Sequence, residues 1–75
     1  MTVYVKLLGE FGDNLSRDHC LDSGNLTVNE VMDTLRIDRS EVSMIMINGT
    51  VSLLEKDARL EDGDSLSLLP ALEGG

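Results

Sequence analysis

The chain has 75 residues, enough for one small domain, and its 14 acidic and 6 basic residues give a formal net charge of −8. This excess of acidic residues argues against nucleic acid and anionic membranes as partners, because both bind clustered lysine and arginine side chains. One cysteine, Cys20, excludes an internal disulfide framework, a cysteine-built metal site and a four-cysteine iron–sulfur centre.

The first third of the chain predicts two strands. Apolar and polar residues alternate over 2–8, which is typical of a half-buried strand, and the glycines and polar residues over 9–14 predict a loop. A weaker second strand is expected over 16–22. We interpret Cys20 in this strand as a half-buried small hydrophobe, and His19 has no neighbours that suggest a set of metal ligands.

A helix is predicted to begin at Thr27. Thr27 and Glu30 have the spacing of a capping box, and Leu26 and Val31 have the spacing of a hydrophobic staple. The helix should end near residue 35 or 36. Its apolar residues recur at helical spacing and predict one stripe that faces the core, formed by Val28, Val31, Met32 and Leu35.

The second half of the chain predicts three more strands. The apolar run over 42–47 is consistent with a strand that is apolar on both faces, and Asn48-Gly49 predicts a type I′ turn into a short strand over 50–53. Residues 54–60 are too few and too charged for a helix, so a single 3₁₀ turn is expected there. An alternating strand over 65–69 follows the acidic turn and stops at Pro70.

The order ββαββ with a final β predicts an α+β domain of the β-grasp (ubiquitin-like) type. A helix with one apolar stripe must lie across one face of a sheet, so we expect a single mixed sheet with this helix packed on it. Residues 1–70 form the predicted domain and residues 71–75 a flexible tail. No apolar stretch approaches the length of a membrane span and no leader pattern precedes the domain, so we expect a cytoplasmic protein.

The last residues carry the strongest functional pattern. Asp62-Gly63-Asp64, an alternating strand, Pro70 and a final Gly74-Gly75 follow one another closely. The two glycines have no side chain, so they could thread a narrow channel, and the only reactive group at this end is the Gly75 carboxylate.

This stretch resembles the C-terminal half of the MoaD/ThiS family of ubiquitin-like sulfur carriers. The proline and the spacing are more similar to MoaD, the small subunit of molybdopterin synthase, than to ThiS, the carrier of thiazole synthesis. Ala71 stands where MoaD proteins often carry a second proline, and Glu73 is more acidic than the residue expected there. A molybdopterin-type client is therefore placed ahead of a thiazole-type one.

The resemblance implies a role for each part of the chain. The first and last strands should pair in parallel at the centre of the sheet. An E1-like adenylyltransferase should adenylate Gly75 and allow its conversion to a thiocarboxylate, whose sulfur then passes to a MoaE-like synthase large subunit or an equivalent acceptor. The tail that presents Gly75 comprises Ala71, Leu72, Glu73 and Gly74.

The chain itself has no nucleotide-binding loop and no nucleophile–base pair, so we expect a carrier and substrate, with no catalytic residue, metal or cofactor of its own. Docking on the partners needs a surface besides the tail. We predict it on the sheet face opposite the helix. Its residues are Tyr4, Lys6, Leu69 and Pro70, with either Met44 and Met46 or Ile45 and Ile47.

Two other functions stay open from the sequence. A ubiquitin-like modifier joined to a lysine through Gly75 shares the chemistry up to the adenylate. A β-grasp interaction module in which the two glycines are incidental is the third possibility. Mass spectra of the protein from its host separate the first two, because a thiocarboxylate supports a sulfur carrier and lysine-linked conjugates support a modifier.

Overall fold

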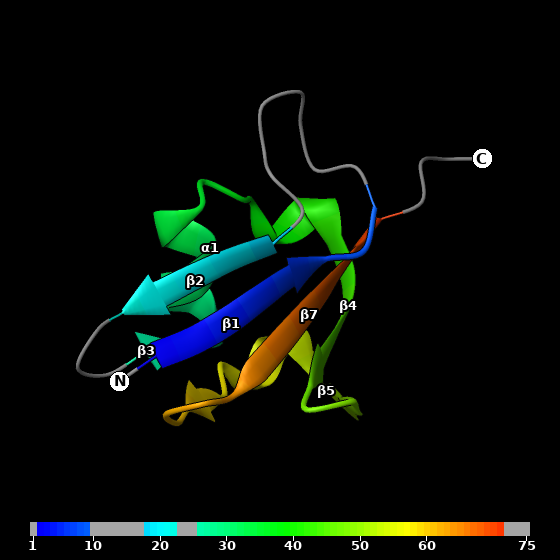
Figure 1. The fold of residues 1–75 in the computed structure, drawn as a ribbon. Helices are drawn as coiled ribbons and strands as arrows, with labels where there is room; N and C mark the ends of the chain where they lie inside the picture. The colour runs from blue at the N-terminus through cyan, green and yellow to red at the C-terminus, as the bar shows by residue number, and fades with distance from the viewer. Residues whose placement is uncertain (1, 10–17, 23–25, 72–75) are drawn as a thin grey trace.

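A five-stranded mixed sheet in the order β2-β1-β7-β4-β5 forms the body of the protein (Figure 1). The computed structural model describes residues 2–9, 18–22 and 26–71. The five strands are β1 (Thr2–Leu7), β2 (Asp18–Asp22), β4 (Val42–Ile47), β5 (Thr50–Ser52) and β7 (Ser65–Pro70). β1 and β7 pair in parallel and the other neighbouring strands pair antiparallel. The predicted central parallel pair of first and last strands is confirmed.

Helix α1 (Val28–Thr34) begins as the sequence predicts. The Glu30 backbone N–H donates to Thr27 Oγ1 over 3.3 Å, and the Thr27 backbone N–H donates to Glu30 Oε1 over 3.1 Å, so the capping box is confirmed. At the other end Arg36 adopts a left-handed φ of 58°, and the N–H of Ile37 reaches the carbonyl of Met32. This arrangement closes the last turn, with arginine at the position that usually holds glycine.

A second, two-stranded ladder was not predicted. β3 (Leu26–Thr27) pairs antiparallel with β6 (Arg59–Leu60), so the expectation of a single sheet is wrong. Each strand has two residues, which is too short for an alternating pattern to be recognised in the sequence. The connecting segments form two 3₁₀ turns, η1 (Arg39–Glu41) and η2 (Leu54–Lys56), the second of them at the place where one turn was predicted.

The hairpin between β4 and β5 has the predicted turn. Asn48 has a φ of 52° and Gly49 a φ of 83°, and a type I′ turn requires positive values at both positions. The turn fixes the register of the hairpin, with Met46 opposite Val51 and Ile47 opposite Thr50.

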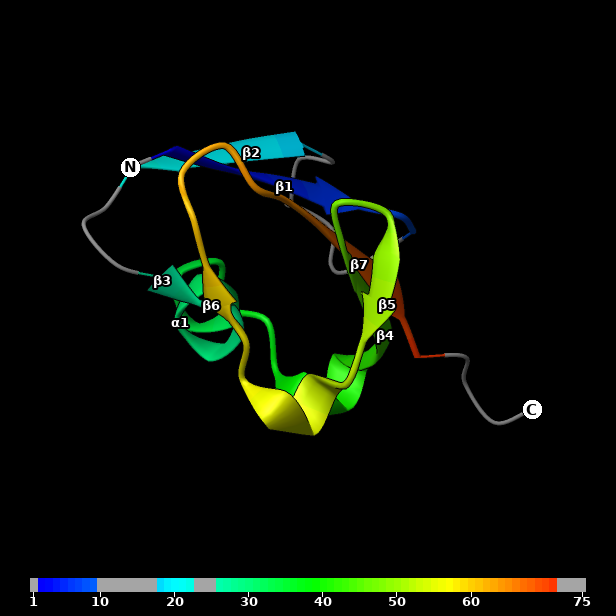
Figure 2. The same ribbon diagram turned by 90° about the horizontal axis from the view of Figure 1, so that it is seen from below.

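The core lies between α1 and one face of the five-stranded sheet. Figure 2 shows α1, β3 and β6 on this side. The predicted helix stripe is buried, together with side chains from β1, β3, β4, β6, β7 and the connecting segments: Val3, Val5, Leu7, Leu26, Val28, Val31, Met32, Leu35, Ile37, Val42, Ile45, Leu60, Leu66 and Leu68. All of these residues are aliphatic, in line with the scarcity of aromatic residues.

Cys20 is exposed, which corrects the prediction that it is half buried. It lies on β2, an edge strand, directly opposite Tyr4 of β1. His19 and Leu21, the residues on either side of Cys20, point to the α1 side, so Cys20 faces the other side of the sheet. The strand is confirmed over Asp18–Asp22, and residues 16 and 17 lie outside the described residues.

Candidate functional site

Successive side chains of the central strand β7 alternate between the buried core and the opposite face of the sheet. Leu66 and Leu68 point to α1 and are completely buried, whereas Ser65, Ser67 and Leu69 lie on the opposite face and are partly exposed. We call the sheet face opposite α1 the outer face. No helix or strand within residues 2–9, 18–22 and 26–71 covers it (Figure 2).

The register of the sheet brings the predicted docking residues to the outer face. Tyr4 lies opposite Ser65, and Lys6 opposite Ser67, along the parallel pair of β1 and β7. Tyr4 keeps 53% of its surface exposed. Leu69 is the outer-face residue at the far end of β7, one residue before Pro70.

β4 contributes Met44 and Met46 to this face, which decides between the two alternatives left by the sequence. Met44 lies opposite Leu69 and Met46 opposite Ser67, while Ile45 is completely buried. The register of β4 against β7 shifts between Val42 and Met44. Two residues therefore separate the buried Val42 from the buried Ile45, so simple alternation could not assign the faces of this strand.

The predicted surface did not include Val51 and Leu8, which are among the exposed apolar residues. Val51 of β5 is 59% exposed and lies opposite Met46, and Leu8 is 43% exposed just after β1. The type I′ turn and the alternation over 2–8 were signals that could have identified both. We define the outer-face patch as Tyr4, Leu8, Met44, Met46, Val51 and Leu69. A group of apolar side chains without a cover inside its own domain is typical of an interaction surface.

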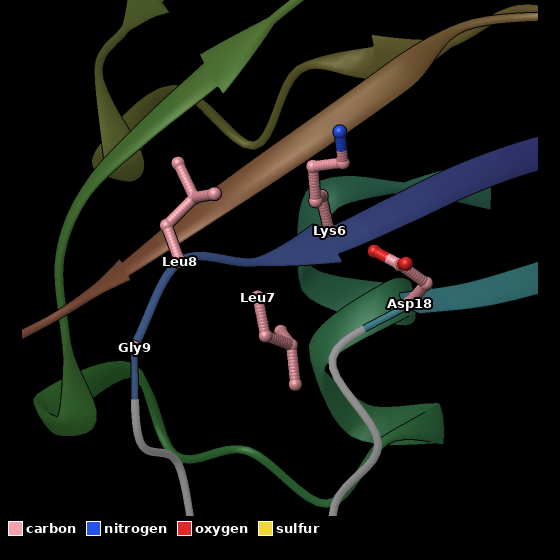
Figure 3. Close-up of a pocket in the computed structure, with 5 residues that line it drawn as sticks. All are labelled: Lys6, Leu7, Leu8, Gly9 and Asp18. Atoms are coloured by element: carbon pink, nitrogen blue, oxygen red, sulfur yellow. The ribbon is translucent and has the colours of Figure 1, made fainter.

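A hollow of about 500 Å³ lies at the end of β1, lined by Lys6, Leu7, Leu8, Gly9 and Asp18 (Figure 3). Lys6 and Leu8 point to one side of β1 and Leu7 to the other, while Asp18 of β2 turns toward Lys6. Lys6 and Asp18 are direct cross-strand neighbours of opposite charge. The hollow shares Leu8 with the outer-face patch, and its five lining residues include no nucleophile–base pair.

The acidic turn before β7 is a structural element. The Asn48 side-chain amide donates to Asp64 Oδ1 over 2.9 Å, and the Glu61 backbone N–H donates to Asp64 Oδ2 over 2.8 Å. The Asn48 bond first, and then the Glu61 bond, hold the pKa of the Asp64 carboxyl below its ordinary value of 3.8. Asp62 in turn accepts the Thr2 backbone N–H. The turn therefore ties the start of β7 to the β4–β5 hairpin and to β1.

The predicted tail begins within the described part of the chain. Pro70 is the last residue of β7, one residue later than predicted, and lies opposite Val42 of β4. The Ala71 backbone N–H donates to the Glu41 carbonyl over 2.8 Å, so the body still holds this residue. Leu72, Glu73, Gly74 and Gly75 lie outside the described residues, and the division at residue 70 and the flexible tail stay predictions.

The described residues offer no sign of other chemistry. They contain no group of three or more His, Cys, Asp or Glu side chains that could hold a metal ion. Within the same part of the chain, every helix is too short or too polar to cross a membrane.

The parallel β1–β7 pair at the centre, the helix across one face and the chain leaving from the central strand together define a ubiquitin-like β-grasp protein. The model of the ThiS family matches residues 5–75, and the chain belongs to this family.

A solved structure is similar over the full length of both chains, with 25% sequence identity and a TM-score of 0.63. It is a chain of the protein–protein complex of subunits 1 and 2 of molybdopterin-converting factor from Helicobacter pylori 26695. No curated protein matches the sequence significantly. The predicted resemblance is thereby confirmed, and family membership supports the role of a small sulfur carrier.

Proposed function

We propose that this protein carries sulfur as a thiocarboxylate on Gly75 and donates it in the synthesis of a molybdopterin-type cofactor. The observation that carries the proposal is the match to the ThiS family over residues 5–75, a range that includes the Gly74-Gly75 pair. The similarity to a chain of molybdopterin-converting factor favours this client over a thiazole-type one.

The chemistry follows from the weak reactivity of a carboxylate. An E1-like adenylyltransferase joins the Gly75 carboxylate to the AMP portion of ATP and releases pyrophosphate. The terminal sulfur of a persulfide then attacks the carbonyl carbon and AMP leaves. A thiol cleaves the resulting acyl disulfide and leaves the thiocarboxylate. The partners supply every catalytic group that these reaction steps need, so the protein acts as a carrier and substrate, not as an enzyme.

The outer-face patch supports docking beside the point where the chain leaves the sheet. Tyr4 and Lys6 on β1, with Leu69 and Pro70 at the end of β7, would contact the E1-like enzyme on this face. The five residues 71–75 span at most about 17 Å when extended, at roughly 3.3 Å each. That reach lets Gly75 enter a recessed site while the sheet stays on the partner surface.

A synthase large subunit is the second proposed partner. The similar chain from Helicobacter pylori was solved in a complex of two subunits of molybdopterin-converting factor. A shared docking face would make the two partners compete, because the tail and the outer-face patch serve only one of them at a time.

Deletion of Gly74 and Gly75 tests the proposal. The shortened chain ends at Glu73, whose side chain adds a negative charge where the phosphate of ATP must approach. We expect ATP–pyrophosphate exchange with the cognate E1-like enzyme to be abolished and stability to be almost unchanged, because a chain end buries little surface. The truncated protein should still compete with the intact protein for the enzyme, since its sheet is intact.

Equal exchange by the intact and truncated proteins would show that Gly75 is not the reactive group. The intact mass of protein purified from its host provides a second test. A mass that corresponds to replacement of one oxygen by sulfur at the C-terminal glycine would support the sulfur-carrier function. Conjugates through a lysine of another protein, without any thiocarboxylate, would support the modifier instead.

A further inference from the structure

The point where the chain leaves the sheet is held from the side of β4. Ser43 Oγ donates to the Pro70 carbonyl over 2.9 Å and lies 3.4 Å from the Leu69 carbonyl. The Ala71 N–H donates to the Glu41 carbonyl. Ser43 lies at the register shift between Val42 and Met44, next to the pair of Val42 and Pro70 that ends the ladder. These bonds guide the backbone for one residue beyond β7.

Gly9 closes the same point from the side of β1. A Cβ atom built on Gly9 would lie 2.5 Å from Pro70 Cγ and 2.8 Å from Pro70 Cδ, closer than real Cβ atoms approach other heavy atoms. The Gly9 backbone therefore lies directly against the proline ring, and any side chain at this position must displace the ring. The neighbouring Leu8 N–H donates to the Leu68 carbonyl over 2.9 Å and keeps the two segments together.

We propose that Gly9 and Ser43 are positioning residues that clamp Pro70, next to the bond from the Ala71 N–H to the Glu41 carbonyl, and thereby set the direction in which the C-terminal residues leave the body. This inference rests on the proposed carrier function. Pro70 suits the role because its ring fixes φ near −65° and its nitrogen needs no hydrogen-bond acceptor. On one side, Gly9 lies against the proline ring. On the other side, Ser43 bonds two carbonyl groups and the Glu41 carbonyl accepts the Ala71 N–H.

The direction matters once a partner holds the four residues beyond Ala71 in an extended conformation. Residues 72–75 extend for up to about 13 Å, so a turn of about 30° at their base would move the last residue by about 7 Å. Reacting atoms must lie within roughly 3–3.5 Å of each other in a productive complex. A body that docks correctly but releases its tail in many directions would fill the partner's active site in only a fraction of encounters.

The clamp contributes to the fold through few buried atoms. Ser43 and Glu41 are exposed, so removal of the Ser43 hydroxyl leaves no cavity in the core. An effect on turnover without a matching effect on docking would therefore separate a positioning role from a structural one.

The test compares Ser43→Ala and Gly9→Ala with two matched controls in ATP–pyrophosphate exchange. Ser40→Ala removes an exposed hydroxyl outside the clamp. Gly49→Ala strains a left-handed residue, with a φ of 83°, where a Cβ meets no atom within 4 Å. We expect kcat to fall about tenfold for Gly9→Ala and at least about threefold for Ser43→Ala. KM and the docking Kd should stay unchanged in Ser43→Ala, which leaves the Pro70 ring in place. Both controls should keep the kcat of the unchanged protein.

Two further measurements keep the result interpretable. Ser43→Thr retains the hydroxyl and should restore kcat. Amide hydrogen exchange at Ala71 should accelerate in Ser43→Ala and Gly9→Ala and stay slow in both controls. This measurement needs no partner and shows directly whether the clamp holds Ala71. Should Gly9→Ala fail to fold, Ser43→Ala and its rescue by threonine still decide the question.

Faster exchange at Ala71 with unchanged kcat would overturn the positioning role and leave the carrier function standing. A fall in folded fraction that accounts for the whole loss of activity would overturn it too. Absence of pyrophosphate exchange by the unchanged protein would overturn the carrier function itself, and this inference with it.

Discussion

Leu68 and Leu69 are neighbours on β7, yet they serve different surfaces. Leu68 is completely buried against α1, and Leu69 is partly exposed on the outer face beside Met44. The same division continues across the sheet, with the buried Val5 and the exposed Tyr4 on β1. The comparison shows that apolar residues on one strand are explained by the core on one face only. Those on the other face are not explained by the core, and the proposed docking on a partner gives them a role.

The largest effect should come from shortening the buried leucine. Leu68→Ala should lower the free energy of unfolding by about 2–5 kcal/mol, because a core filled from both sides cannot collapse around the lost atoms. Leu69→Ala removes the same atoms on the other face and should cost less than about 1 kcal/mol. Urea denaturation of both variants, monitored by circular dichroism, measures the difference.

Similar losses in the free energy of unfolding of the two variants would contradict the difference between the two faces. The outer face would then contribute to the fold as much as the core does. A domain of this size has only a few kcal/mol of stability to lose. Leu68→Ala is therefore expected to be largely unfolded at a temperature where Leu69→Ala is native.

The next effect concerns binding. Leu69→Lys should weaken docking on the E1-like enzyme by about tenfold or more, which is roughly 1.4 kcal/mol, because a charge would be placed inside an apolar contact. Thr34→Lys adds the same charge on the exposed side of α1 and serves as the control. Isothermal titration calorimetry measures both affinities. Equal affinities for Leu69→Lys and the unchanged protein would remove Leu69 from the docking surface.

The sequence predicted the parts of this molecule that depend on local patterns. The capping box at Thr27 and the Asn48-Gly49 turn were both identified, because each needs particular residues at fixed spacing. The last strand and the helix stripe followed from periodicity. The family resemblance added the parallel pairing of β1 with β7, which no local pattern indicates.

The remainder depended on contacts between distant segments. The β3–β6 ladder joins residues more than 30 positions apart and has only two residues in each strand. The register shift in β4 hid which of its residues face outward, so Met44 and Met46 could not be chosen over Ile45 and Ile47. Cys20 was assigned as half buried from its residue type, but it lies on the face of an edge strand without a cover.

The smallest expected effect concerns Asp64, the residue directly before β7. Its carboxylate accepts hydrogen bonds from Asn48 and from the Glu61 N–H, and these lower its pKa in the folded state. Since the folded pKa lies below the unfolded one, these bonds stabilise the fold fully above the ordinary pKa of 3.8. The contribution is lost as the pH falls below that value, through the folded pKa.

Asp64→Asn should therefore lower the free energy of unfolding by up to about 1 kcal/mol at pH 7. The difference from the unchanged protein should shrink as the pH falls below 3.8, because protonation removes the same charge from Asp64 itself. Asp33→Asn on the exposed side of α1 is the control for the loss of one carboxylate from an acidic protein. Urea denaturation at pH 7 and at pH 3 gives the four values needed for each pair. A difference that is the same at both pH values would show that the Asp64 charge does not hold the start of β7. Asp64 would then contribute as little to the free energy of unfolding as we expect Leu69 to contribute.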